Sequence, residues 1–264
     1  NITMSFRDVT LKTFNAEQEF VGLKNYVDVL AMPVVRKAIF NTLFFTVVSL
    51  IFQFVIGFAL ALLFAKKYGL SELSRGLLMV CWLIPVLVFA TIWKWIFAGD
   101  TSGILNYILI QLHVIETPIR WLTTTNGAMT ALIIANIWRG VPFNMLLLAT
   151  GLTTLPMDVF EAAAIDGASK CQRFFRITIP LLKSTIISVI TLGFINTFKV
   201  FDLIYVMTKG GPLDSTQILS TVSYKMSFSN FEFGQGAAVA NIMLVLMLIV
   251  GFFHLKITDR EGVE

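Results

Sequence analysis

Two groups of polar and aromatic residues stand inside otherwise apolar stretches of the sequence. In the first, Asn136, Arg139, Gly140 and Phe143 follow the spacing i, i+3, i+4, i+7, which places them on one face of a helix. The second group lies in a later apolar stretch and comprises Gly193, Asn196, Thr197, Lys199, Val200 and Asp202. Amide, hydroxyl and aromatic groups on two such faces could line a water-filled passage and bind a polar solute.

The charges inside these stretches allow a second interpretation. Arg139 lies about eleven residues into its stretch, roughly 16 Å along a helix, where a charge in a bilayer is costly and is often functional. Arg139 could instead pair with Asp202, and Asn or Thr side chains commonly bond across membrane helices. Lys94 and Lys183 lie near the ends of their stretches, where snorkelling to the interface explains them.

Several kinds of chemistry lack a matching pattern in this sequence. No G-x-x-x-x-G-K-[ST] phosphate loop occurs, so we expect no ATP or other cofactor to be bound by this chain. His113 and His254 stand alone without metal-ligand spacing. Cys81, Cys171 and the serines show no nucleophile arrangement with either histidine, so we expect a non-catalytic protein.

The composition predicts that helices spanning a membrane position these residues. Hydrophobic residues make up 56% of the chain and charged residues 14%, against roughly 25% in soluble domains, and the mean hydropathy is +0.80. Backbone groups in lipid must pair within their own segment, so we expect an all-α, polytopic bundle. Five stretches reach the roughly 20 residues that a span needs: 39–65, 76–98, 128–153, 177–207 and 234–255.

Basic residues in the loops predict the orientation of these spans. Nine lie after the first span, after the third span and in the tail 256–264: Lys66, Lys67, Arg75, Lys170, Arg173, Arg176, Lys183, Lys256 and Arg260. The intervening loops hold three, Arg120, Lys209 and Lys225. We therefore expect the loop 156–176 and the tail in the cytoplasm, and the segment 1–38 outside. That segment itself carries five basic residues, which is explained most easily by a further span upstream of Asn1.

The loop 156–176 contains the signals of two short helices. Asp158 and Glu161 have the spacing of a capping box, and Gly167 suits the left-handed position that ends a helix. Ser169 and Gln172 repeat the capping signal directly afterwards. The alanines that follow Glu161 form a surface of small side chains, which would let another protein approach closely. A loop that only connects two spans is the alternative.

The spacing of this loop also resembles a known family motif. The loop resembles the EAA loop of ABC importer permeases, through Glu161, Ala162, Ala163, Gly167, Ile177 and Pro180. Ile179 stands where leucine is usual in that family. The segments 20–26, 138–143, 201–205 and 210–212 are similar to those of sugar permeases of the maltose and glycerol-3-phosphate type. The resemblance covers nearly the whole chain.

The resemblance implies a function and two sets of site residues. The loop would be the coupling helix that contacts the ATPase, through Glu161, Ala162, Ala163, Asp166 and Gly167. The substrate would be bound by Asn136, Arg139, Gly140, Phe143, Gly193, Asn196, Thr197 and Asp202. The implied partners are a second homologous permease, two ABC ATPase subunits that bind ATP and Mg, an extracytoplasmic sugar-binding protein, and the lipid of a bacterial or archaeal plasma membrane. Nucleic acid is not among them.

Two alternatives to sugar import driven by ATP stay open. Arg139 would also suit an anionic substrate such as glycerol-3-phosphate. A secondary transporter that works without ATP would use helices broken near the midplane, and Gly140-Val141-Pro142 is the clear candidate for such an interruption. The sequence identifies neither the sugar nor its length.

Overall fold

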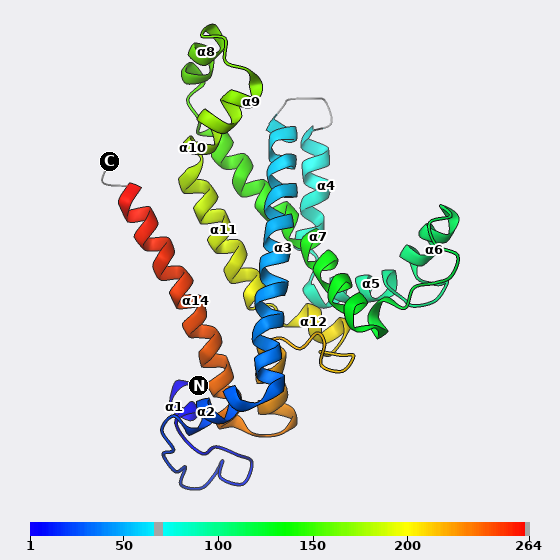
Figure 1. Ribbon diagram of the computed structural model, residues 1–264, viewed down its shortest axis with the longest axis vertical. Coiled ribbons are helices and arrows are strands. Elements are labelled where there is room, and N and C mark those ends of the chain that lie inside the picture. The colour runs from blue at the N-terminus through cyan, green and yellow to red at the C-terminus, as the bar shows by residue number, and fades with distance from the viewer. Residues whose placement is uncertain (66–70, 262–264) are drawn as a thin grey trace. The chain divides into compact units, whose positions relative to one another are not determined.

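The computed structural model describes residues 1–65 and 71–261, and helices dominate this part of the chain (Figure 1). The helices before the loop 156–176 are α1 (Ile2–Ser5), α2 (Lys24–Ala31), α3 (Pro33–Ala65), α4 (Ser71–Leu83), α5 (Val86–Ile96), α6 (Ile104–Gln111), the 3-10 turn η1 (Trp121–Thr123) and α7 (Thr125–Thr153). The later ones are α8 (Met157–Ile165), α9 (Lys170–Arg173), the π-helix η2 (Phe174–Thr178), α10 (Ile179–Leu181), α11 (Lys183–Phe198), α12 (Asp202–Met207), α13 (Leu219–Tyr224), the π-helix η3 (Lys225–Ser229) and α14 (Phe233–Glu261). The predicted all-α class is confirmed.

Helices long and apolar enough to cross a membrane occur in each of the predicted regions. Three are uninterrupted: α3, α7 and α14 up to Lys256. Two more regions pass the same test only as pairs with a break, namely α4 with α5, and the segment Lys170–Leu181 with α11, the latter bent by 69°. Within the described residues, the chain therefore has three such helices, or up to five if each pair is one span.

Two of the predicted spans are interrupted in the structure, and proline explains the first interruption. The stretch 76–98 is broken at Ile84 and Pro85, where Pro85 adopts an extended conformation before α5 and cannot donate a backbone hydrogen bond. The stretch 177–207 is likewise interrupted between Phe198 and Asp202. The expected interruption at Pro142 does not occur, because α7 continues through this proline, as membrane helices do when their surroundings satisfy the freed groups.

The ends of the predicted segments also differ from those observed. The helix α3 begins at Pro33, within the predicted outer segment 1–38, and α14 continues to Glu261 through most of the predicted tail. Lys66 and Lys67, which contributed to the predicted orientation, lie outside the described residues, as does the end of the tail at 262–264.

The chain divides into two compact units. Unit 1 comprises residues 1–49, 84–136 and 196–249, and in it α5 packs on α12. Its N-terminal segment is fixed to α14 by buried side chains, since Asn241 Nδ2 donates to Ser5 Oγ at 2.9 Å and to the Tyr26 hydroxyl at 3.1 Å. Figure 1 shows α1 and α2 beside the start of α14 accordingly.

Unit 2 comprises residues 50–83, 137–195 and 250–264. Its core is a hydrophobic cluster from three helices: Phe58, Ala61 and Phe64 of α3, Met145, Leu148 and Ala149 of α7, Leu182 and, from α11, Val189. Thr191 Oγ1 and His254 Nδ1 lie 3.0 Å apart and join α11 to α14. This unit carries the loop 156–176 on the packed ends of α7 and α11.

Candidate functional site

The helix α8 ends as the sequence predicts. Gly167 has a φ of +78°, and the backbone amides of Gly167 and Ala168 donate to the carbonyls of Ala164 at 3.2 Å and Ala163 at 2.9 Å. These two bonds form a Schellman motif, which satisfies carbonyls that a helix end otherwise leaves unpaired. The chain therefore reverses sharply at Gly167 and begins a second helical segment at Lys170.

The two predicted capping boxes have different outcomes. Around α9 the box is confirmed, because Gln172 Oε1 accepts from the Ser169 amide at 2.8 Å and Ser169 Oγ accepts from the Gln172 amide at 3.3 Å. Asp158 does not cap α8, since the helix already begins at Met157 after an extended Pro156. Asp158 lies in the first turn instead, where its negative charge is favourable to the helix dipole.

Aromatic packing attaches this loop to the core of unit 2. Phe174 lies 5.6 Å from Phe58 of α3 and 5.0 Å from Phe175, measured between ring centroids. The helices that follow, η2 and α10, continue into α11 across Leu182, which is buried. Figure 1 shows α8 and α9 at one end of this unit. The loop thus stands on a packed base, and no residue of α8 itself is buried.

The predicted coupling residues form an accessible surface. Glu161, Ala162, Asp166 and Gly167 are exposed, and Ala163 is half-buried. Ile165 of the same helix is 87% exposed, an unusual position for a large apolar side chain. Beside it lies a cavity of about 310 Å³ lined by Asp166, Gly167, Ala168, Gln172, Arg176 and Ile177. Exposed apolar groups bordered by two carboxylates suit contact with another protein.

Two of the predicted substrate-binding residues of unit 2, Gly140 and Gly193, lie near Asn144 of α7. Asn144 Nδ2 donates to the Gly140 carbonyl at 2.9 Å, and its Oδ1 lies 3.8 Å from the position that a Cβ on Gly193 would occupy. A Cβ on Gly140 would collide with the side chain of Gln53, and one on Gly193 would come within 2.7 Å of Leu50 Cδ1. The two predicted glycines therefore lie close together, and both are needed for close approach of side chains from α3.

Two further predicted residues of this unit differ in their surroundings. Phe143 stacks on Trp82 of α4, with ring centroids 5.7 Å apart and ring planes at 18°. Arg139 is half-buried. The ring of Phe143 is therefore already engaged by an aromatic neighbour, which leaves less of its surface for a solute.

The other predicted substrate-binding residues belong to unit 1. Asn136 and Thr197 are buried, whereas Asn196 and Asp202 are exposed. Asp202 begins α12, where its carboxylate lies in the first turn of the helix. Because Arg139 and Asp202 are in different units, both their pairing and their joint role in binding stay predictions.

Sequence analysis missed two buried amides. Gln53 is 2% exposed and Asn144 1%, and Asn144 Oδ1 has no hydrogen-bond partner among the described residues. An unpaired buried acceptor is costly and points to a ligand or an alternative partner. The signal for Gln53 was present, because it is the lone amide within the charge-free stretch 42–65. Asn144 is at i+4 from Gly140 and could have extended the first polar face.

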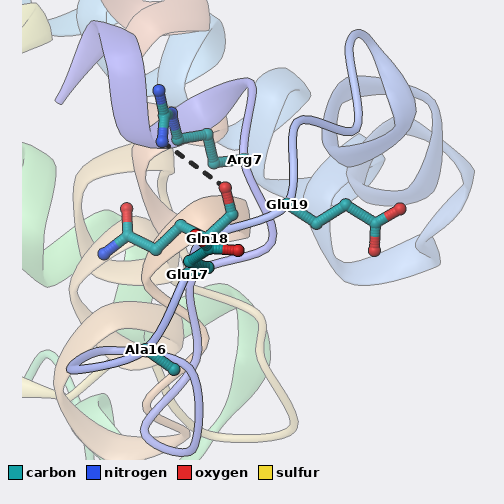
Figure 2. A pocket seen from close by; sticks show the side chains of 5 residues that line it. All are labelled: Arg7, Ala16, Glu17, Gln18 and Glu19. Atoms are coloured by element: carbon teal, nitrogen blue, oxygen red, sulfur yellow. Dashed lines mark hydrogen bonds between the residues drawn. The ribbon is translucent and has the colours of Figure 1, made fainter.

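Two other cavities lie away from these residues. One of about 530 Å³ is lined by Arg7, Ala16, Glu17, Gln18 and Glu19 of the N-terminal segment, and Figure 2 shows the Arg7 guanidinium donating to the Gln18 carbonyl at 3.4 Å. The second, of about 140 Å³, has an apolar wall that includes Leu60, Cys81 and Pro142. Neither includes a predicted site residue, and the described residues contain no group of three or more His, Cys, Asp or Glu suited to a metal.

Comparison with known proteins agrees with this geometry. The chain is 36% identical over 251 residues to the trehalose/maltose transport system permease protein MalF of Thermococcus litoralis, covering 95% of this chain and 83% of that protein. It is 32% identical over 253 residues to the sulfoquinovosyl glycerol transport system permease protein SmoG of Agrobacterium fabrum, covering 96% and 81%.

Solved structures support the same fold. A bacterial ABC transporter that imports the acidic polysaccharide alginate matches 98% of this chain and 88% of its own chain, with a TM-score of 0.83 and 21% identity. Residues 53–261 match the model of the binding-protein-dependent transport system inner membrane component. The chain therefore belongs to the family of inner membrane components of binding-protein-dependent transport systems.

Proposed function

We propose that this chain is the permease subunit of an ABC importer that carries a sugar across the plasma membrane. The observation that carries the proposal is the exposed helix α8, closed by Gly167 and anchored on the core of unit 2 through Phe174. Two relatives that are at least 32% identical are named for the transport of trehalose/maltose and of sulfoquinovosyl glycerol, which favours a carbohydrate substrate.

Energy coupling would run through α8. Its exposed Ile165 and alanines offer an apolar contact to an ATPase subunit, while Glu161 and Asp166 border that contact with negative charge. Phe174 and Leu182 join the base of the loop to α3 and α11, so a push on α8 would be transmitted to the helices that carry Gly140 and Gly193. The ATP, its Mg and the chemistry of hydrolysis belong to the ATPase in this proposal.

Substrate would pass the polar groups around Asn144. The unpaired Oδ1 of this amide can accept a hydrogen bond from a sugar hydroxyl, and Gly140 and Gly193 add no side chain of their own beside it. Asn136, Thr197 and Asp202 would supply further amide, hydroxyl and carboxylate groups in unit 1. A second homologous permease would complete the passage, and an extracytoplasmic binding protein would deliver the sugar.

Cross-linking tests the proposed contact with the ATPase. In a chain whose exposed Cys171 is replaced by serine, Ile165→Cys should form a cross-link to the cognate ATPase subunit with a short bifunctional maleimide. The matched control is Leu213→Cys, since Leu213 is 86% exposed but lies in a loop predicted on the opposite side of the membrane. Cross-linking of Leu213→Cys but not of Ile165→Cys would contradict the docking of the ATPase on α8.

A further inference from the structure

Four aromatic rings form a cluster in unit 1 that the predicted site does not include. Tyr224 lies at its centre, with ring centroids 4.9 Å from Phe201, 5.1 Å from Tyr205 and 5.1 Å from Phe228. Phe201 and Tyr205 also stack on each other at 5.1 Å with ring planes at 21°. We call Phe201, Tyr205, Tyr224 and Phe228 the four-ring cluster. It joins α12 to α13 and η3.

One edge of the four-ring cluster faces outward. Phe228 is 63% exposed, whereas the other three rings are half-buried. Phe228 belongs to the π-helix η3, a rare geometry that is often found at functional sites. The exposed ring of Phe228 packs on Tyr224, which in turn contacts the rings of Phe201 and Tyr205.

Polar contacts hold this arrangement in place. Ser220 Oγ of α13 donates to the carbonyl of Val200, the residue before Phe201, at 2.7 Å. Lys225 Nζ, at the start of η3, lies 3.9 Å from Asp214 Oδ1. Asp202, one of the predicted substrate-binding residues, follows Phe201 in the chain and is exposed. Two charged residues, Asp202 and Lys225, are therefore direct chain neighbours of cluster residues, and Lys225 lies near the carboxylate of Asp214.

The two tyrosine hydroxyls are paired with each other. A hydrogen bond to Tyr205 raises the pKa of Tyr224 above its ordinary value, because the bond needs the Tyr224 proton. The remaining lone pairs of the two hydroxyls can accept hydrogen bonds from a polar ligand while the rings keep their places.

We propose that the four-ring cluster is a stacking platform for a pyranose ring, used by the sugar on its way to or from the groups near Asp202. Sugars present a face of C–H groups to aromatic rings and a rim of hydroxyls to carboxylates and amines. The four-ring cluster supplies the rings, and its chain neighbours Asp202 and Lys225 supply a carboxylate and an amine. The proposal rests on the proposed function and adds a binding site to it. An interfacial aromatic belt is the competing explanation, because Tyr and Phe also lie at the level of lipid head groups.

Sugar uptake and ATP hydrolysis, measured in the same complex, distinguish the stacking platform from the interfacial aromatic belt. The complete complex in proteoliposomes is supplied with saturating loaded binding protein and radiolabelled maltose or trehalose. Phe228→Leu should lower sugar uptake roughly five- to tenfold, the loss expected for one aromatic contact, while ATP hydrolysis stimulated by the binding protein changes less than about twofold. Phe228→Tyr should restore uptake because it keeps the ring.

The control is Phe231→Leu, which removes a 42% exposed ring that pairs with Phe233 outside the four-ring cluster. It should leave uptake unchanged. Equal uptake by Phe228→Leu and the wild type would overturn the platform, as would loss of assembly in both Phe228→Leu and Phe228→Met, since the ring would then serve packing. A wild-type complex that takes up no sugar would contradict the proposed function itself.

Discussion

A glycine at position 167 is required by backbone geometry and not by crowding. Its φ of +78° is in the left-handed region, which costs other residues roughly 1–2 kcal/mol. A Cβ there would meet nothing within 4 Å, so any effect of substitution must come from the backbone. The sequence predicted this position because glycine ends helices in that conformation, and the spacing to Ser169 left little choice of boundary.

Gly167→Ala should therefore weaken the association with the ATPase roughly tenfold by disturbing the end of α8. Titration of purified ATPase onto the reconstituted permease measures this affinity. Gly76→Ala is the matched control, because Gly76 is an exposed helical glycine with nothing within 4 Å of its Cβ position and no positive φ. An equal loss in both variants would show that the backbone argument is wrong.

Two buried asparagines allow a contrast between binding and structural roles. Asn241 has its amide satisfied by Ser5 and Tyr26, whereas Asn144 Oδ1 has no partner among the described residues. Asn144→Leu should lower sugar uptake severalfold while the complex assembles with an unchanged melting temperature. Asn241→Leu should destabilise the chain by about 1–3 kcal/mol, because it removes two hydrogen bonds made by a buried amide. Thermal unfolding of both variants and sugar uptake by Asn144→Leu distinguish a binding role from a structural role.

At the scale of elements, one buried side chain organises the segment between α5 and η1. Asn106 of α6 donates to the carbonyls of Ala98, Asp100 and Ile119 and accepts from the Ile119 amide and Trp121 Nε1, at 3.0–3.2 Å. It is completely buried. A single residue thereby closes a loop that has little hydrophobic core of its own.

Asn106→Asp keeps the shape but replaces the donating amide with an oxygen that faces three carbonyls. We expect the segment 98–121 to open at a cost of about 1–3 kcal/mol, or more if the carboxylate stays charged. Faster cleavage between residues 99 and 124 in limited proteolysis would report this opening. Gln111→Glu makes the same chemical change at an exposed position of α6 and should leave the cleavage rate unchanged.

The helices themselves could be predicted from the sequence, but their breaks could not. Long apolar stretches must be helical in lipid whatever their details, so α3, α7 and α14 follow from composition. Pro142 suggested a break in a helix that in fact continues, whereas the break at Pro85 was not predicted. Its effect depends on whether neighbouring groups satisfy the carbonyl that it frees, and that is a property of the packed structure.

The candidate site was predictable to a similar extent. Gly140 and Gly193 follow from helical spacing, and the structure brings them together. Gln53 and Asn144 were missed, since a lone amide in an apolar stretch resembles ordinary helix packing until its surroundings are known. The four-ring cluster joins residues from α12 and η3, and no local pattern in the sequence reveals it.

At the scale of the whole molecule, the central claim is that this permease imports a sugar at the expense of ATP hydrolysed by a partner. Family membership establishes a binding-protein-dependent transport system, while the substrate and the coupling contact on α8 are proposals. An anionic substrate bound by Arg139 and a transporter independent of ATP are the alternatives to be excluded.

The most direct test is uptake of radiolabelled maltose or trehalose by proteoliposomes that contain the full complex, with ATP and loaded binding protein supplied in turn. The account predicts uptake only when ATP, the ATPase subunits and the binding protein are all present, and no uptake with a non-hydrolysable ATP analogue. Uptake by the permease without its ATPase, or uptake of glycerol-3-phosphate in place of either sugar, would contradict it.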